Sequence, residues 1–272
     1  RMMGNTSTGI DDYKNISFWF DSLGQPVHNR PRLEHDKQVD VAIIGAGYTG
    51  LWTAYYLKQQ QPDLSIAIVE AKTAGFGASG RNGGWLMGSI SGASKYLAGL
   101  SQSERKTGYQ LLFGIIDEVA GVLALENIDC DLHRGGAIYA AARYPEQLQF
   151  VQDDLKHLHR QGLDESDYRW LTKPELEQQL RIRNGYGGIY TPHCALINPV
   201  KLVRELADCV AAKGVAIYEQ SPVLTVQDKV LHTRQGRLRA DIIVPATEGF
   251  SDRLMQINQY LLPVQSLIIA TE

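Results

Sequence analysis

Three closely spaced glycines and a later glutamate are the residues whose types and spacing most directly predict chemistry in this sequence. Gly45, Gly47 and Gly50 form the run G-A-G-Y-T-G, and Glu70 ends the next apolar run. Residues without a Cβ permit a tight turn, a close approach of the backbone to a pyrophosphate, and close helix–strand packing. N–H groups at a helix start attract phosphate. The pattern predicts a dinucleotide site, and the carboxylate disfavours NADP, whose 2′-phosphate it would repel.

The segments around these glycines are the elements that must position them. Residues 39–44 are rich in β-branched residues, as expected of a strand buried on both faces. Residues 51–60 contain no glycine and place apolar residues on one helical face, and the run 65–69 leads into Glu70. Glycine-rich turns also occur for purely structural reasons, but the order strand, turn, helix, strand, acid favours a Rossmann-like fold. This order does not separate FAD from NAD or a similar nucleotide.

A second glycine cluster follows the acid directly. Residues 74–86 read A-G-F-G-A-S-G-R-N-G-G-W-L, with little side-chain bulk. Ser79, Arg81 and Asn82 add hydrogen-bond donors, and the guanidinium of Arg81 suits a phosphate. A flexible linker is the competing interpretation, but linkers rarely finish in Trp-Leu-Met. The cluster therefore favours a backbone-lined groove for a large, flat ligand.

Together, V-D-V-A-I-I-G-A-G-Y-T-G, I-V-E-A and G-A-S-G-R-N-G-G resemble the FAD-dependent amino-acid and amine oxidases, of the D-amino-acid oxidase, glycine oxidase and sarcosine oxidase type. The last run is most similar to the γ-glutamylputrescine oxidase-like branch. The resemblance implies the α/β class, with a Rossmann-like FAD-binding domain, an inserted α+β substrate domain and an incomplete C-terminus. Because no cysteine lies in a segment that the resemblance brings to the flavin, noncovalent FAD is expected.

The resemblance also implies which residues hold FAD, and they lie at the two glycine clusters or at strand ends. Pro245 donates no ladder hydrogen bond, so the strand before Ala246 is unusual for the family. The implied residues are Gly45, Ala46, Gly47, Tyr48, Thr49, Gly50, Glu70 and Ala71 on the ADP half; Ala78, Ser79 and Gly80 near the pyrophosphate and ribityl chain; Arg81, Asn82, Gly83, Gly84, Trp85 and Leu86 beside the flavin ring; Val223 at the adenine through its backbone; and Ala246 and Thr247 near the dinucleotide.

Residues 88–195 carry no recognisable catalytic motif of their own. The expected domain organisation is therefore the one that the resemblance implies. The expected segments are an irregular lead-in at 1–38, the first FAD-binding segment at 39–90, part of the substrate domain at 91–195, the second FAD-binding segment at 196–250, and a truncated return to the substrate domain at 251–272. Family members continue for about another domain-sized segment, of roughly 100 residues or more, so an incomplete chain is expected.

Three local patterns support this organisation. Residues 197–214 read as a helix with Asn198 as its N-cap and Pro199 in its first turn. Leu111, Ile115, Val119 and Val122 recur at helical spacing and are predicted to be core. The aromatic run Phe18-Trp19-Phe20 is expected to dock on the body of the protein by packing rather than to contact a ligand.

Composition narrows the function further. The 272 residues carry a net charge of −3 with a pI near 6.2, which gives no indication of nucleic-acid binding or an anionic membrane. Three scattered cysteines favour a reducing cytoplasm. We find no continuous apolar stretch of about 18 residues and expect no membrane span. His157 and His159 stand too close for ligands on one helical face, His193 is expected to pack or cap, and no metal site is predicted.

The resemblance implies oxidation of the C–N bond of an amine or amino acid by hydride transfer to flavin, with an oxidase giving an imine and peroxide. Oxygen or another electron acceptor would complete the cycle, and the oligomeric state stays open. An FAD monooxygenase of the aromatic-hydroxylase type is one alternative, although A-D-I-I-V-P-A-T lacks the expected Asp-Gly. A non-catalytic or accessory flavin-binding protein is another. No catalytic residue is assigned, because the substrate-orienting residues are expected beyond Glu272.

Overall fold

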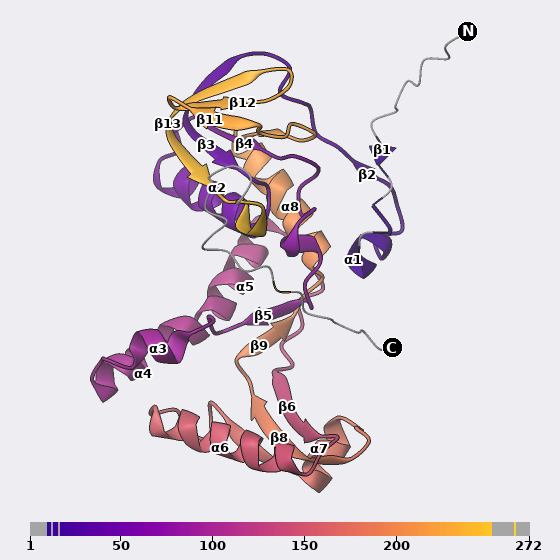
Figure 1. Ribbon diagram of the computed structural model, residues 1–272, viewed down its shortest axis with the longest axis vertical. Coiled ribbons are helices and arrows are strands. Elements are labelled where there is room, and N and C mark those ends of the chain that lie inside the picture. Colours follow the sequence, from indigo (N-terminus) through magenta and orange to yellow (C-terminus); the bar gives the residue numbers. More distant parts are fainter. Residues whose placement is uncertain (1–9, 12, 16, 252–263, 265–272) are drawn as a thin grey trace. The chain divides into compact units, whose positions relative to one another are not determined.

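The structure is a computed structural model that describes residues 10–11, 13–15, 17–251 and 264. Its chain divides into two compact units (Figure 1). The first unit comprises residues 1–83, 128–130 and 198–272, and the second comprises 84–127 and 131–197. The predicted return strand in 251–272 lies outside the described residues, apart from Ser251 and Val264.

The first unit is built on a six-stranded sheet in the order β10-β4-β3-β13-β12-β11. The four strands from β10 to β13 run parallel, and β12 and β11 are added antiparallel. This sheet confirms the predicted α/β class. Its strands are β3 (Lys37–Ile44), β4 (Ile66–Val69), β10 (Ala216–Tyr218), β11 (Thr225–Gln227), β12 (Val230–His232) and β13 (Arg237–Pro245).

The central strand β3 is buried where the sequence is richest in β-branched residues. Val41, Ala42, Ile43 and Ile44 are each at most 3% exposed, as expected for a strand covered on both faces. Each fully buried Val or Ile side chain contributes about 1.5–3 kcal/mol to the free energy of folding. The buried strand therefore gives the glycine turn that follows it a rigid base.

Two helices of this unit pack against each other, α2 (Tyr48–Gln60) and α8 (Pro199–Ala212). As predicted, Asn198 caps α8, and its side chain accepts a hydrogen bond from the N–H of Lys201. Leu206 and Val210 on the apolar face of α8 are fully buried. The remaining elements of the unit are β1 (Ile10–Asp11), α1 (Phe18–Asp21), β2 (Val27–His28) and the single-turn 3-10 helices η1 (Ala78–Gly80) and η2 (Glu248–Phe250).

The second unit contains a three-stranded antiparallel sheet in the order β6-β8-β7, with α6 and α7 packed against it, and a separate β5–β9 pair. Leu171 and Ile189 are the most buried apolar residues of the larger sheet's β7 and β8. The elements are β5 (Trp85–Met87), α3 (Ala93–Leu97), α4 (Gln102–Phe113), α5 (Ile115–Glu126), β6 (Ala137–Ala142), α6 (Glu146–Arg160), β7 (Arg169–Thr172), α7 (Lys173–Gln179), β8 (Gly185–Thr191) and β9 (Cys194–Leu196).

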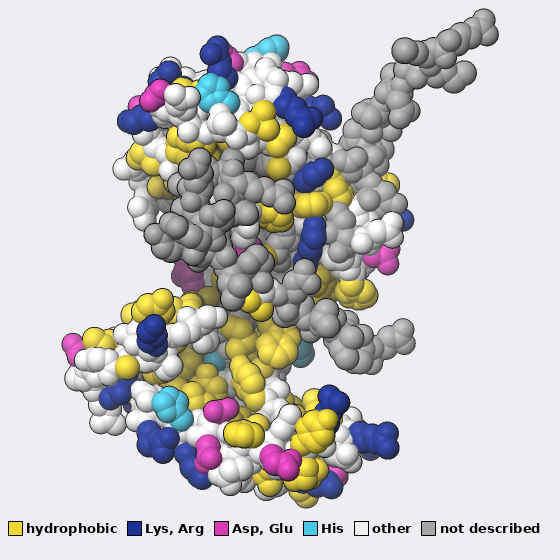
Figure 2. Space-filling model, in the orientation of Figure 1, with side chains coloured by type: hydrophobic (Ala, Val, Ile, Leu, Met, Phe, Trp, Pro, Cys, Tyr) yellow, Lys and Arg dark blue, Asp and Glu magenta, His cyan; other side chains and the backbone are white. Residues whose placement is uncertain are grey.

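The α4–α5 run corrects two expectations. Leu111 is 73% exposed rather than core, and Ile116 is buried while Ile115 is only half-buried. The predicted periodicity crosses Gly114, where α4 ends and α5 begins, so the two helices do not share one continuous face. Hydrophobic side chains accordingly show on the surface of this unit (Figure 2). By length and composition alone, Gln102–Glu126 could also cross a membrane, although only 22% of its most apolar window is buried. The polar residues within Gln102–Glu126 interrupt its apolar pattern, and one such helix is weak support for a membrane span.

Candidate functional site

The turn from β3 to α2 contains two positions that only glycine can occupy without displacement of the backbone. Gly45 has a φ of +107°, and a Cβ there would lie 2.5 Å from the carbonyl oxygen of Ala246. A Cβ on Gly50 would lie 2.1 Å from the carbonyl oxygen of Gly45. Real Cβ atoms do not approach backbone oxygens so closely. The first glycine therefore serves the turn and the third serves close packing of α2 on the strand.

The N-terminus of α2 lies against the second glycine cluster. Ser79 Oγ accepts a hydrogen bond of 2.9 Å from the N–H of Tyr48, and a Cβ on Gly47 would lie 2.9 Å from the same oxygen. Among the residues that the structure describes, no group accepts a hydrogen bond from the N–H of Gly47 or Thr49. These N–H groups at the positive end of a helix suit a pyrophosphate.

Glu70 lies directly after β4 and is tied to the glycine turn. One carboxylate oxygen accepts a 2.9 Å hydrogen bond from the N–H of Ala46, and the other accepts one of 2.9 Å from Lys72. Burial raises the pKa of Glu70, and the nearby charge of Glu219 raises it further, against the lowering effect of the backbone donors. The carboxylate is thus positioned at the end of the second strand, where a ribose would be recognised.

The raised pKa of Glu70 predicts a pH-dependent stability. Because the folded chain keeps this proton to higher pH than the unfolded chain, whose carboxyl titrates near 4.5, the free energy of unfolding should fall as pH rises from 4.5 through the folded pKa. Glu70→Gln should flatten this part of the profile. Urea unfolding of the FAD-free protein at several pH values would measure the slope, and parallel profiles for both proteins would contradict the prediction.

Two predicted side chains of the site donate hydrogen bonds to backbone carbonyl groups of the protein. The Tyr48 hydroxyl donates to the carbonyl of Pro199 at 2.9 Å, and burial raises the pKa of its phenol. Arg81 Nε donates to the carbonyl of Phe76 at 2.8 Å, and its guanidinium lies 4.5 Å from the centre of the Phe76 ring. Tyr48 therefore contributes to the turn through its backbone, and Arg81 braces the second glycine cluster.

The predicted residues nearest the C-terminus lie in two different parts of the first unit, after β13 and before β11. Ala246 lies against Gly45, and its N–H donates to the carbonyl of Ile44 at 2.8 Å. Pro245 is the last residue of β13, opposite Ile44, so its missing donor interrupts no interior ladder. Among the described residues, neither the backbone N–H nor the C=O of Val223 has a hydrogen-bond partner, which leaves both for a ligand such as adenine.

The remaining predicted residues are less constrained by contacts. Thr247 Oγ1 lies 2.7 Å from Ser251 Oγ, and Ala71 and Ala78 are exposed. Asn82 and Gly83 continue the loop in the first unit, whereas Gly84, Trp85 and Leu86 belong to the second unit. There the carbonyl of Gly84 accepts from the N–H of Ile197 at 2.8 Å, and Trp85 on β5 is 56% exposed. The assignment of all these residues to the cofactor stays a prediction.

Glu219, the residue after β10 that leads out of the strand, was not singled out from the sequence. Its side chain is fully buried and accepts hydrogen bonds from Arg30 N (2.7 Å), Arg30 Nη1 (2.9 Å) and Ala74 N (2.8 Å). Arg204 Nη1 lies 3.8 Å away and donates to Thr73 Oγ1. Glu219 thus fixes the start of the second glycine cluster. An acid after an apolar run, the signal that identified Glu70, also identifies Glu219.

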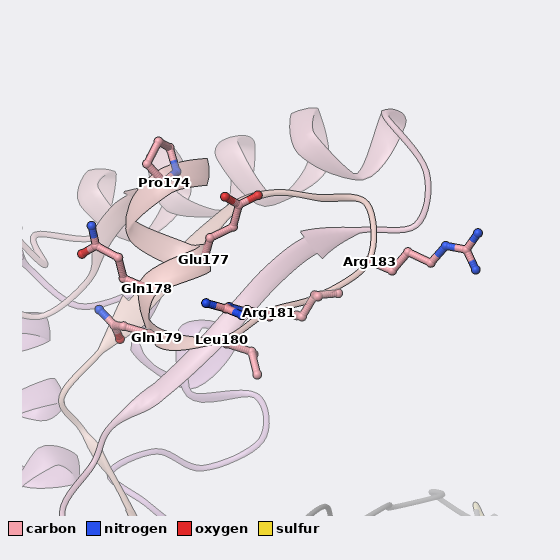
Figure 3. A pocket seen from close by; sticks show the side chains of 8 residues that line it. Pro174, Glu177, Gln178, Gln179, Leu180, Arg181 and Arg183 are labelled. Atoms are coloured by element: carbon pink, nitrogen blue, oxygen red, sulfur yellow. The ribbon is translucent and has the colours of Figure 1, made fainter.

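Other features of the described chain do not compete with this site. No group of three or more potential metal ligands occurs among the described residues. A surface hollow is lined by eight residues of the segment 174–183, in and after α7, where Arg183 points away from the other labelled side chains (Figure 3). No predicted cofactor residue lines it. His193, as expected, is packed: its ring stacks on Phe113 and Nε2 lies 2.9 Å from Asp167 Oδ1.

A parallel sheet, a glycine turn at a helix N-terminus and a carboxylate after the second strand define a Rossmann-type dinucleotide-binding protein. Among the residues that the structure describes, the N–H groups of Gly47 and Thr49 and the backbone of Val223 have no hydrogen-bond partner, which fits an extended adenine dinucleotide. Residues 40–272 match the family DAO, described as FAD dependent oxidoreductase. The chain belongs to this family, and FAD is its cofactor.

The chain is similar to several known members of this group. It is 28% identical over 270 residues to the "Probable oxidoreductase OrdL" of Haemophilus influenzae, covering 94% of this chain and 60% of that protein. It is 26% identical over 242 residues to the gamma-glutamylputrescine oxidoreductase of Escherichia coli, covering 86% and 55%. The glycine oxidase of Geobacillus kaustophilus superposes with a TM-score of 0.65 at 25% identity, covering 80% and 57%. The chain therefore spans between 55% and 60% of these proteins.

Proposed function

We propose that the intact protein oxidises the C–N bond of an amine or amino acid with FAD as the electron acceptor. The observation that carries this proposal is the family match over residues 40–272, together with the geometry of its glycine turn. The names of two relatives support the substrate class, since γ-glutamylputrescine is an amine and glycine is an amino acid. The particular substrate stays open.

The chain's own residues bind and orient the cofactor in this proposal. The N–H groups of Gly47 and Thr49 would hold the pyrophosphate, the Glu70 carboxylate the ribose, and the backbone of Val223 the adenine. When bound, FAD supplies a two-electron acceptor, so that the amine leaves as an imine and oxygen is reduced to peroxide.

Noncovalent attachment and a cytoplasmic location are part of the same proposal. Cys130 and Cys194 are buried, and none of the three cysteines lies in either glycine cluster. Their small number and wide separation support a reducing compartment. We therefore expect acid precipitation of the intact protein to release the flavin into the supernatant.

The test uses the intact gene product. We expect a yellow protein with a flavin absorbance band that produces peroxide with one or more members of a panel of amines and amino acids, including γ-glutamylputrescine and glycine. A colourless protein that ignores added FAD would overturn the proposal. NAD(P)H-dependent oxygen consumption with an aromatic acid would replace it with a monooxygenase, and bound FAD without turnover on the panel would replace it with an accessory role.

A further inference from the structure

The N-terminal lead-in makes two hydrogen bonds to the backbone of the second glycine cluster. Ser17 Oγ donates to the carbonyl of Gly80 at 2.7 Å, and Trp19 Nε1 donates to the carbonyl of Asn82 at 2.7 Å. Each bond joins residues 63 positions apart in the sequence. The family match begins at residue 40, so both donors come from outside the matched region. Ser17 and Trp19 therefore contact the backbone of the second glycine cluster.

Phe20 fixes the lead-in on this loop. Its side chain is 1% exposed and packs with Tyr13, Val27 and Val200. A Cβ on Gly80 would lie 2.9 Å from Phe20 Cε2, so the ring occupies space that only a glycine leaves. Because the Phe20 ring cannot shift without disrupting this cluster, its packing fixes the positions of the donors Ser17 and Trp19 relative to the loop.

The loop also makes hydrogen bonds to α2 and within itself. Ser79 Oγ accepts from the N–H of Tyr48 at the start of α2, and Asn82 Nδ2 donates to the carbonyl of Ser79 at 2.9 Å. The loop from 79 to 82 therefore has hydrogen bonds both to the lead-in and to the helix whose N-terminus is the predicted pyrophosphate site. A change in either set of bonds would alter the orientation of its peptide groups.

The bond from Trp19 has a directional consequence. The carbonyl of Asn82 and the N–H of Gly83 belong to one planar trans peptide, so the two groups point in opposite directions. The indole holds the carbonyl on the lead-in side and thereby aims the Gly83 N–H away from the lead-in. Among the described residues, that N–H has no acceptor. A ligand acceptor atom on that side would complete it.

We propose that Trp19 is a positioning residue that aims the Gly83 N–H at the bound cofactor, with Ser17 and Phe20 holding it in place. The inference rests on the proposed function, because FAD is the ligand whose oxygen or ring nitrogen would accept this hydrogen bond. It assigns a role in cofactor geometry to a segment that precedes the family match. Trp19 itself need not touch the cofactor.

The test compares variants of the intact protein that differ by one hydrogen bond. Trp19→Phe removes the indole N–H but keeps an aromatic ring, and Phe150→Leu on α6 is the control, since Phe150 is 69% exposed and lies in the second unit. We expect Trp19→Phe to raise the FAD dissociation constant about tenfold, to shift the flavin absorption spectrum, and to lower kcat with little change in KM. Phe150→Leu should match the wild type in all four quantities.

A second pair of variants separates positioning from folding. Ser17→Ala should weaken FAD binding in the same direction, and Ser17→Thr, which keeps the hydroxyl, should restore it. If Trp19→Phe does not fold, this pair decides. Wild-type affinity and an unshifted spectrum in Trp19→Phe, or in Ser17→Ala where that pair decides, would overturn the inference while leaving the proposed function intact. A wild-type protein that does not bind FAD would instead overturn the proposed function and this inference with it.

Discussion

Gly50→Ala is expected to lose most of its FAD affinity and part of its stability. The added Cβ would lie 2.1 Å from the carbonyl oxygen of Gly45 and 3.1 Å from Ile43 Cγ2. Neither neighbour is the end of a flexible side chain, so α2 must move away from β3. Overpacking of this kind lowers the free energy of unfolding by about 1–3 kcal/mol. Because the N-terminus of α2 is the predicted phosphate site, the same displacement should weaken FAD binding on the order of 10- to 100-fold.

The matched control is Gly121→Ala in α5, where an added Cβ meets no atom within 4 Å. Alanine is the better helix former by about 0.5–1 kcal/mol, so this variant should be slightly stabilised with unchanged FAD affinity. Titration of the FAD-free protein followed by flavin fluorescence, together with urea unfolding, measures both effects. Equal FAD affinity in Gly50→Ala and the wild type would show that close packing of α2 on the strand is not required.

The part of the site set by local constraints was predictable from the sequence. Gly45 and Gly50 are dictated by a turn and by a helix start that lie within six residues, and Glu70 by the end of the next strand. Such constraints produce fixed spacings. The cap and the first turn of α8 were predictable for the same reason, because Asn198 and the N–H of Lys201 are three residues apart.

The contacts that were missed join distant parts of the chain. Trp19 bonds the backbone of residue 82, and Glu219 bonds Arg30, which is 189 positions away. Contacts between residues so far apart leave no repeating pattern in the sequence from which they could be predicted. The lead-in was expected to be irregular with an aromatic run that packs; its packing was anticipated, but its hydrogen bonds to the cofactor loop were not.

In the second unit, the periodicity of apolar residues also failed to predict which side chains are exposed. The spacing of Leu111 with Ile115, Val119 and Val122 predicts one apolar face, yet Leu111 is exposed and Ile116 is buried. A helical stripe indicates that some surface is apolar; what covers it depends on the tertiary arrangement. Glycine turns are easier to predict, because the local backbone conformation itself requires a residue without a Cβ.

Glu219→Ala is expected to produce the largest loss of stability of any single side-chain truncation proposed here. Glu219 is fully buried and is the common acceptor for the backbone N–H groups of Arg30 and Ala74 and for the Arg30 guanidinium. Removing one partner of a buried ion pair lowers the free energy of unfolding by about 3–5 kcal/mol. Arg30 keeps its contact with Asp208, which places the expected loss at the lower end of that range. Urea unfolding measures it.

Two comparisons decide whether the loss belongs to the buried pair. Asp208→Asn removes a partner that is 73% exposed and should change the unfolding free energy little, since exposed ion pairs contribute little. Arg30→Met combined with Glu219→Leu removes both charges of the closer pair and should be more stable than Glu219→Ala, because Arg30 is no longer left without its buried partner, while Arg204 lacks the Glu219 charge in both variants. A double variant no more stable than Glu219→Ala would show that the loss comes from the hydrogen bonds to the backbone N–H groups of Arg30 and Ala74, which both variants lack, rather than from an unpaired charge.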